Sequence, residues 1–180
     1  MPKRIENVPG QLLEEAGRQV AERGYAKTTV RSVAAACGIA VGTVYNYFPS
    51  KQMLVASYMA RDWKQSLAAM AAGNRNNAEA CLHTIYEELA AFTRRHRALF
   101  ADPEAARAVS DVIWTRHLQL REQLANLIAP FAPSPDGFTA AFLAEALLTW
   151  TVSDTPFAQI YGILSKLIPE HKEDDAHEQL

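Results

Sequence analysis

The chain has 180 residues, of which 49% are hydrophobic, and a formal net charge of −2. This is enough for one large core, or for a small domain joined to a larger one. No apolar run approaches the roughly 20 residues of a membrane span, and the first ten residues lack the apolar centre of a signal peptide. We therefore expect a cytoplasmic protein with no membrane partner, and the isolated pair Cys37 and Cys81 fits a reducing compartment.

Every element that the apolar periodicity predicts is a helix, and no strand pattern occurs, so the predicted fold class is all-α. The spacing of apolar residues, together with Pro and Gly at the ends, sets the expected bounds. The helices are expected over residues 9–24, in two short pieces between 28 and 49, and over 50–72, 77–100, 104–129, 138–152 and from 156 onward.

Charge is distributed unevenly along these elements. Residues 1–65 hold nine Lys and Arg against five Asp and Glu, whereas residues 66–180 hold nine against fifteen. A basic first third followed by an acidic remainder favours a nucleic-acid-binding head on a body that DNA repels. Chance clustering of solvated charges is the alternative, so this observation gains weight only from a motif.

The stretch from Thr28 to Lys51, TTVRSVAAACGIAVGTVYNYFPSK, has the spacing of a helix-turn-helix. Gly38 stands where the turn needs a positive φ, and Pro49 ends the second helix. Ser50 then offers a hydroxyl cap for the helix that follows. The second helix turns hydroxyl, amide and small side chains outward in place of Lys and Glu, and such groups reach phosphate oxygens and base edges. Packing of its tyrosines inside a small helical domain is the alternative.

The segments Ala21–Gly38, AERGYAKTTVRSVAAACG, and Ile39–Lys51, IAVGTVYNYFPSK, resemble a TetR-family transcriptional regulator. The resemblance covers about the first third of the chain. It implies that Thr28 and Thr29 cap the first motif helix and touch the DNA backbone, and that Lys51 meets a phosphate. With the exposed face of the second helix, the predicted DNA-contacting residues are Thr28, Thr29, Arg31, Val41, Gly42, Thr43, Tyr45, Asn46, Tyr47 and Lys51.

Two positions depart from the family pattern. Ala40 stands where the family usually has a Ser or similar capping residue, so the second motif helix should lack a side-chain N-cap. Val41 stands where a polar or basic side chain is frequent. Because Val41 can contact a thymine methyl, direct base readout should be more apolar here.

The expected domains are a helix-turn-helix DNA-binding domain at residues 1–50 and a helical regulatory and dimerisation domain at residues 51–180, linked by the long helix from about 50 to 72. The last two helices are apolar nearly all round, and a chain this small cannot cover both. We expect two copies to pair as a four-helix bundle, an interface that the family resemblance also implies. The predicted interface residues are Phe138, Leu147, Trp150, Phe157, Ile160, Tyr161, Leu164 and Leu167.

Aromatic and soft side chains with polar tips on the body helices predict a pocket for a small organic effector, although plain core packing is the alternative for each of them. The predicted ligand-binding residues are Trp63, Leu67, Met70, Cys81, Tyr86, Leu89, Phe92, Trp114, His117 and Phe142.

The five histidines do not fall into ligand spacing with Cys or carboxylates, and His96 and His117, which lie on apolar stripes, are expected to be hydrogen-bonded core histidines. No phosphate loop, nucleophile elbow or carboxylate pair occurs, so we expect no metal site, no cofactor and no enzymatic activity. The predicted function is a ligand-responsive transcriptional repressor that binds a palindromic DNA operator as a homodimer. A small α-helical enzyme using Cys81 or His117, and a helical interaction module that does not bind DNA, are the alternatives.

Overall fold

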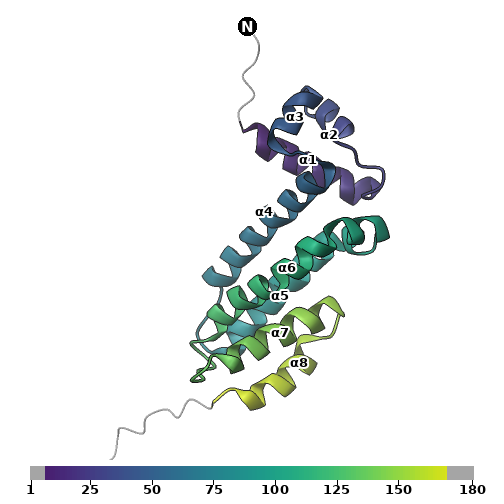
Figure 1. The fold of residues 1–180 in the computed structure, drawn as a ribbon. Helices are drawn as coiled ribbons and strands as arrows, with labels where there is room; N and C mark the ends of the chain where they lie inside the picture. Colours follow the sequence, from purple (N-terminus) through teal and green to yellow (C-terminus); the bar gives the residue numbers. More distant parts are fainter. Residues whose placement is uncertain (1–6, 170–180) are drawn as a thin grey trace, which may run out of the picture. The chain divides into compact units, whose positions relative to one another are not determined.

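The computed structural model describes residues 7–169, and all of their side chains except those of residues 106 and 108–115 (Figure 1). Within this range every regular element is a helix, which confirms the all-α fold class. The helices are α1 (Val8–Arg23), α2 (Val30–Ala36), α3 (Val41–Tyr47), α4 (Lys51–Ala72), α5 (Ala78–Phe100), α6 (Pro103–Ile128), α7 (Phe138–Val152), α8 (Phe157–Leu164) and the 3-10 helix η1 (Ser165–Leu167).

The chain divides into two compact units. The first unit comprises residues 1–69 and 90–119, and the second comprises residues 70–89 and 120–180. Helices α1, α2 and α3 belong wholly to the first unit, and α7 and α8 belong wholly to the second. The three longest helices, α4, α5 and α6, contribute residues to both.

Helices α1, α2 and α3 form a three-helix head within the first unit (Figure 1). Its core contains Leu12 from α1, Val33 and Ala34 from α2, and Val44 from α3, all of which are completely buried. Gly38, in the turn between α2 and α3, has a φ of 66°, a left-handed conformation that Gly adopts without steric cost. The predicted helix-turn-helix is therefore present in the fold.

A glycine inside α1 receives an aromatic ring from α4. A Cβ atom built on Gly17 would lie 2.5 Å from Cε2 of Tyr58, so any larger residue at this position would displace the ring. Arg61, nearly one turn further along α4, donates from Nη1 to the carbonyl oxygen of Gly10 at 3.2 Å. Packing and hydrogen bonding together hold α4 against α1.

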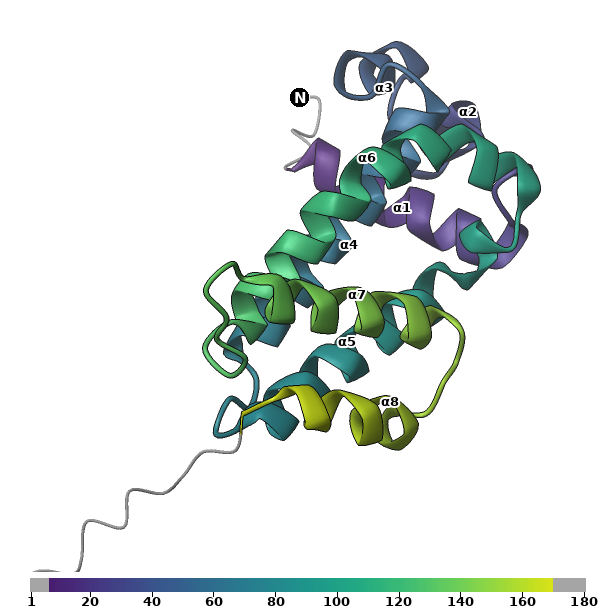
Figure 2. The same cartoon turned by 60° about the horizontal axis from the view of Figure 1, so that its bottom comes forward.

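In the second unit, α7 and α8 lie side by side (Figures 1 and 2). Leu143 and Leu147 of α7 are completely buried, whereas Phe138, Phe142 and Trp150 of the same helix are 65%, 47% and 53% exposed. Helix α7 therefore exposes several large apolar side chains as well as burying others. None of the helices in the described range is both long and apolar enough to cross a lipid bilayer.

Candidate nucleic-acid interface

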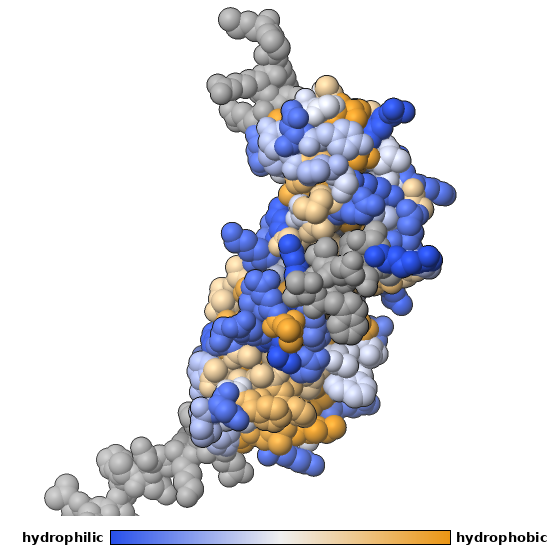
Figure 3. All heavy atoms as spheres, viewed as in Figure 1, coloured by the Kyte–Doolittle hydropathy of each residue, from blue (hydrophilic) through white to orange (hydrophobic). Residues whose placement is uncertain are grey.

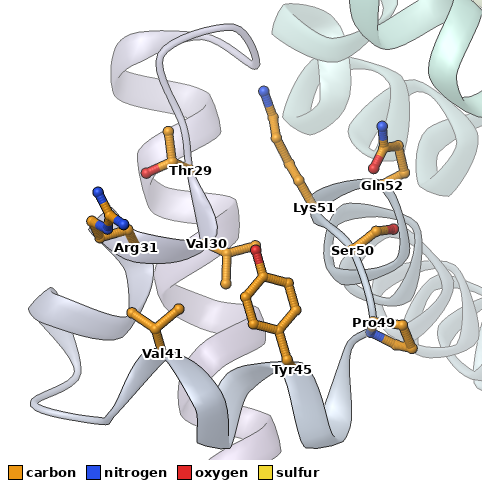
Figure 4. A pocket seen from close by; sticks show the side chains of 9 residues that line it. All are labelled: Thr29, Val30, Arg31, Val41, Tyr45, Pro49, Ser50, Lys51 and Gln52. Atoms are coloured by element: carbon orange, nitrogen blue, oxygen red, sulfur yellow. The ribbon is translucent and has the colours of Figure 1, made fainter.

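A groove of about 580 Å³ opens on the head, between the start of α2, the exposed side of α3 and the start of α4 (Figure 4). Five of the ten predicted DNA-contacting residues line it. The groove has four further lining residues that the sequence did not predict to contact DNA, and one of them, Ser50, was expected only as a helix cap. The lining residues are Thr29, Val30, Arg31, Val41, Tyr45, Pro49, Ser50, Lys51 and Gln52.

Helix α3 presents the face that the sequence predicted. Val44 is completely buried in the head core, whereas Tyr45 and Tyr47 are 50% and 48% exposed. Gly42 and Asn46 are exposed as well. Because a tyrosine in a packed core would be covered, the half-exposed rings are available to a partner outside the head.

The start of each motif helix follows from local chemistry. Thr29 is the N-cap of α2: its Oγ1 accepts from the Ser32 amide at 2.9 Å, and Ser32 Oγ accepts from the Thr29 amide at 3.1 Å. Ala40 is the N-cap of α3 and, as predicted, makes no side-chain cap hydrogen bond. Ser50 Oγ accepts from the Met53 amide at 3.1 Å, which confirms the predicted cap of α4.

Thr28 departs from the prediction that it caps α2 and touches DNA. Its side chain is buried, and its hydroxyl donates to the carbonyl oxygen of Gly24 at 2.9 Å. The hydroxyl therefore stabilises the turn that follows α1, and the cap of α2 is Thr29. A single sequence does not distinguish two adjacent threonines, because either one fits the preference for an N-cap residue.

Lys51 begins α4 at the edge of the groove. Its Nζ lies 3.7 Å from the centroid of the Tyr25 ring, a cation–π contact with a buried side chain. Backbone amides of Ala105, Glu104 and Ala26, with Lys51 as a further nearby charge, hold the pKa of the Asp102 carboxyl below its usual range. Asp102 thus ties the turn between α1 and α2 to the start of α6, all within the first unit.

Among the residues of the first unit that were predicted to bind a ligand, two aromatic side chains pack against each other. Trp63 meets Phe92 edge to face, with ring centroids 5.5 Å apart. Leu67 and His117 are partly buried, and Trp114 lies outside the residues whose side chains are described. Their assignment to a ligand site stays a prediction.

Next to this pair lies a partly buried polar cluster that the sequence did not reveal. His96 Nε2 is 2.7 Å from Oδ2 of Asp62, and Arg95 donates from Nε to the same oxygen at 3.0 Å. His96 also packs on Phe92 and Tyr58, with ring centroids 4.4 and 5.0 Å away. The prediction of a hydrogen-bonded core histidine is confirmed, but its partner could not be read from the sequence because it lies 34 residues away.

Burial lowers the pKa of His96, and the hydrogen bond to Asp62 opposes that shift only in part. Burial would raise the pKa of Asp62, but hydrogen bonds from Arg95 and His96 outweigh it and lower that pKa. At neutral pH the pair is therefore an Asp carboxylate that accepts from a neutral imidazole. Nδ1 of His96 is buried without a hydrogen-bond partner among the described atoms.

The second unit holds the other ligand-binding candidates. Met70, Cys81 and Leu89 are buried, and Tyr86 donates its hydroxyl to the carbonyl oxygen of Thr155 at 3.1 Å. Burial raises the pKa of the Cys81 thiol, so this thiol is a poor nucleophile. Phe142, predicted to line a pocket, is instead part of the exposed face of α7, where its ring centroid lies 6.2 Å from that of Phe138.

The predicted dimer interface divides into inner and outer residues. Leu147, Ile160 and Leu164 are buried within the second unit and are therefore unavailable to a second copy. The prediction that these three residues form part of the dimer interface is thus corrected. The physical reason is that α7 and α8 each use one apolar face inside the protomer. Phe157 and Tyr161 are half-buried in a stack with centroids 5.4 Å apart. Side chains that are about half exposed or more define an outer apolar surface, namely Phe138, Phe142, Trp150, Val152, Ile163 and Leu167.

Apolar side chains gather over the α7 and α8 region in the space-filling view (Figure 3). In the described part of the chain, no three His, Cys, Asp or Glu side chains group in a way that could hold a metal ion. The candidate binding surfaces are therefore the groove on the head and the outer apolar surface of the second unit.

The amino-acid sequence matches known proteins over the head and, with one relative, over much of the rest of the chain. Residues 12–58 match the family model of the bacterial regulatory proteins of the tetR family. A fatty acid metabolism regulator protein from Bacillus subtilis is 26% identical over 128 residues, 71% of this chain and 63% of that protein. The HTH-type transcriptional repressor KstR2 from Mycobacterium tuberculosis is 48% identical over 46 residues, 26% of this chain and 23% of that protein. The chain thus spans less than two thirds of the length of either relative.

Solved structures share the fold over most of the chain. A TetR-family transcriptional regulator from Rhodococcus has a TM-score of 0.66, and the match covers 89% of this chain and 98% of that one. The sequence identity is 15%, so the likeness concerns the fold. It extends beyond the head to the helices that follow it.

Proposed function

We propose that the chain, whose residues 12–58 match the tetR family model, is a TetR-family regulator and acts as a ligand-responsive repressor that binds a palindromic operator as a homodimer. The observation that carries the proposal is the groove on the head, where exposed α3 residues meet the start of α4. Its partner is double-stranded DNA, so the protein acts in the cytoplasm. As a member of a family of DNA-binding regulators, the chain is not an enzyme.

Two parts of the groove divide the work of DNA binding. Lys51 and the free backbone amides at the start of α4 meet phosphate oxygens, because the N-terminus of a helix attracts anions. The exposed face of α3 enters the major groove, as the second helix of a helix-turn-helix does. Tyr45 and Tyr47 supply aromatic contact area and hydroxyl groups there, and Thr29 contributes a further hydroxyl at the edge.

The effector site that we propose lies in the first unit, beside the edge-to-face pair of Trp63 and Phe92. Nδ1 of His96, a buried acceptor with no partner among the described side chains, would receive a donor from the ligand. Aromatic rings around one such group suit an amphipathic organic molecule. The Bacillus subtilis relative is named for fatty acid metabolism, and effectors with an acyl chain are the first to test here.

A contact path supports a response of the head to that site. The ring of Tyr58 packs on His96 on one side and fills the space above Gly17 of α1 on the other. A ligand that favours a different position of Tyr58 would shift the population of head orientations relative to α4. Since coupling is reciprocal, operator and effector would weaken each other's binding by the same factor.

A second copy of the chain would cover the outer apolar surface of the second unit. Phe138, Trp150 and Ile163 expose more than half of their area to water, which is unfavourable for large side chains. A two-fold axis through this surface pairs two heads, and a two-fold pair of heads reads a palindrome.

The test is selection of genomic DNA fragments by the purified protein, followed by mobility shifts on the enriched fragments. We expect a palindromic sequence, and loss of the shift in Tyr45→Ala and Tyr47→Ala variants that keep their helicity. Affinity should fall with a log–log salt slope of about −5 to −9, as for roughly six to ten phosphate contacts. If no fragment is enriched, the alternative of a helical interaction module without DNA binding replaces this proposal.

A further inference from the structure

His96 of α5 is buried, yet one of its two ring nitrogens has no hydrogen-bond partner. The side chain is 0% exposed, and its Nε2 lies 2.7 Å from Oδ2 of Asp62. Nδ1, the other ring nitrogen, is buried as well and meets no partner among the described atoms. A buried polar atom that stays unpaired costs free energy, so a ligand that pairs with it gains affinity.

The neighbours of Asp62 decide which nitrogen of His96 carries the proton. Arg95 donates from Nε to Oδ2 of Asp62 at 3.0 Å, and from Nη2 to Oγ of the buried Ser66 at 2.9 Å. A carboxyl group that accepts from a guanidinium is ionised, and a carboxylate can only accept hydrogen bonds. Nε2 of His96 must therefore be the protonated nitrogen that donates to Asp62.

Nδ1 is then an acceptor. In a neutral imidazole with its proton on Nε2, Nδ1 holds a lone pair and has no hydrogen to give. Burial disfavours the charged imidazolium and lowers the pKa of His96 accordingly. A ligand group that faces Nδ1 must therefore be a hydrogen-bond donor.

This requirement separates the head groups that an amphipathic ligand commonly carries. A carboxylate has no hydrogen to donate, and it would stand across the His96 ring from the Asp62 carboxylate, where like charges repel. Arg95, the cation of this cluster, already donates to Asp62 and Ser66. An ammonium group would donate, but its charge would lose a hydration shell that a single ring nitrogen does not replace. A hydroxyl group donates without bringing a charge.

The side chains around His96 suit an apolar ligand body. The rings of Phe92 and Tyr58 pack on His96 with centroids 4.4 and 5.0 Å away, and that of Phe100 lies at 6.4 Å. The buried Trp63 meets Phe92 edge to face. Aromatic walls with one convergent polar group are the usual form of a small-molecule site.

We infer that the effector is a long-chain alcohol rather than the corresponding fatty acid, and that its hydroxyl group donates to Nδ1 of His96. The inference rests on the proposed effector site and names the head group that this site selects. Asp62 and Arg95 are positioning residues, because they hold the imidazole in the form that accepts.

The first experiment compares four molecules with the same alkyl chain on the wild-type protein without DNA. They are n-decanol, decanoate, decyl methyl ether and decylammonium, and binding is followed by tryptophan fluorescence and by the melting temperature at about pH 8, where decanoic acid is ionised. We expect n-decanol to bind about 5- to 150-fold more tightly than decanoate and the ether, the range for leaving one buried acceptor unpaired. The inference is overturned if any of the other three binds as tightly as n-decanol, or if none of the four binds.

The second experiment removes the acceptor. His96→Phe keeps an aromatic ring and should bind n-decanol no more tightly than the ether. His83→Phe is the matched control, because His83 is an exposed histidine of the same helix, and it should keep the preference for the alcohol. If His96→Phe does not fold, nitrogen NMR of the imidazole in the wild type replaces it: the Nδ1 resonance should be that of an unprotonated nitrogen and should shift on addition of n-decanol. A protonated Nδ1, or an alcohol preference that survives in a folded His96→Phe variant, would contradict the inference.

The response of DNA binding is measured separately, on an operator from the genomic selection. The alcohol should release the wild type from this operator at concentrations where the ether does not. Release by decanoate and not by n-decanol would overturn the inference and leave the proposed function standing. A preference for the alcohol in the first experiment without any change in operator affinity would support the head group and overturn the proposed ligand response.

Discussion

The head helices and the α7–α8 pair both bury one apolar side, but they leave different chemistry outside. In the head, α3 buries Val44 and turns hydroxyls, an amide and half-exposed tyrosines outward. In the second unit, α7 buries Leu147 and turns Phe138 and Trp150 outward. An amphipathic helix buries all of its apolar surface when one side packs against the core. A helix that is apolar all round still exposes apolar surface on its other side, which a further partner must bury. The polar exposed face of the head therefore suits contact with DNA, whereas the α7–α8 pair requires an apolar partner.

The largest expected effect comes from a variant that leaves a cavity beneath α7. Leu147→Ala should lower the free energy of unfolding by about 2–5 kcal/mol, because Leu147 is completely buried and its removal leaves an unfilled space. Leu118→Ala is the control, since Leu118 of the first unit is 60% exposed and lies outside the outer apolar surface, so its truncation should cost far less. Urea unfolding at one fixed protein concentration measures both. Equal losses would mean that Leu147 is not a core residue.

Charge on the outer apolar surface should separate the copies without unfolding them. Trp150→Glu and Ile163→Glu would bury an unpaired carboxylate in the proposed interface, at several kcal/mol of association free energy. Sedimentation should show a folded monomer, with operator affinity greatly reduced. Leu118→Glu is the matched control, because Leu118 is a 60% exposed leucine in the first unit. A Trp150→Glu variant that remains dimeric would place the interface elsewhere.

Two glycines of the head make a finer comparison. Gly17→Ala should destabilise the protein by about 1–3 kcal/mol, because the new Cβ would lie 2.5 Å from Cε2 of Tyr58. Gly42→Ala on α3 should stabilise it by up to about 1 kcal/mol, because no atom lies within 4 Å of the added Cβ and Ala favours the helix. Thermal melts of both variants test the pair. A stabilised Gly17→Ala variant would show that α4 does not need this close approach.

The Lys51→Ala variant tests the DNA-binding face of the head through the salt dependence of operator affinity. The dimer should lose one phosphate contact in each half-site, which makes its log–log salt slope shallower by about 2. Operator titrations at several salt concentrations measure the slope. An unchanged slope would mean that Lys51 is held by Tyr25 and takes no part in phosphate binding.

The smallest expected effect is a pH dependence of stability. Because burial lowers the pKa of His96 in the folded state, the unfolded chain takes up a proton near its ordinary pKa of about 6.5 while the folded chain does not. Stability should therefore decrease as pH falls below that value. His96→Gln should remove this part of the slope, as urea unfolding between about pH 7.5 and 5 would show. Parallel pH profiles in both proteins would contradict a neutral, buried His96.

Local chemistry made much of the molecule predictable from its sequence. Gly38 marks a turn because positive φ strains other residues, and Ser50 marks a helix start because its hydroxyl satisfies a free amide. The helix bounds followed from apolar spacing and from Pro and Gly at the ends. The exposed face of α3 followed because the side chains that point outward differ in kind from those that point inward.

Tertiary structure alone decided the remaining features. The periodicity of α7 could not separate Leu147 inside from Trp150 outside, because a helix that is apolar all round carries no directional signal. The pairing of His96 with Asp62 joins residues 34 apart on different helices. The ring of Tyr58 from α4 fills the space above Gly17 of α1, and no spacing pattern in the sequence pairs these two residues. Such features depend on which helices meet, and only long-range packing determines that.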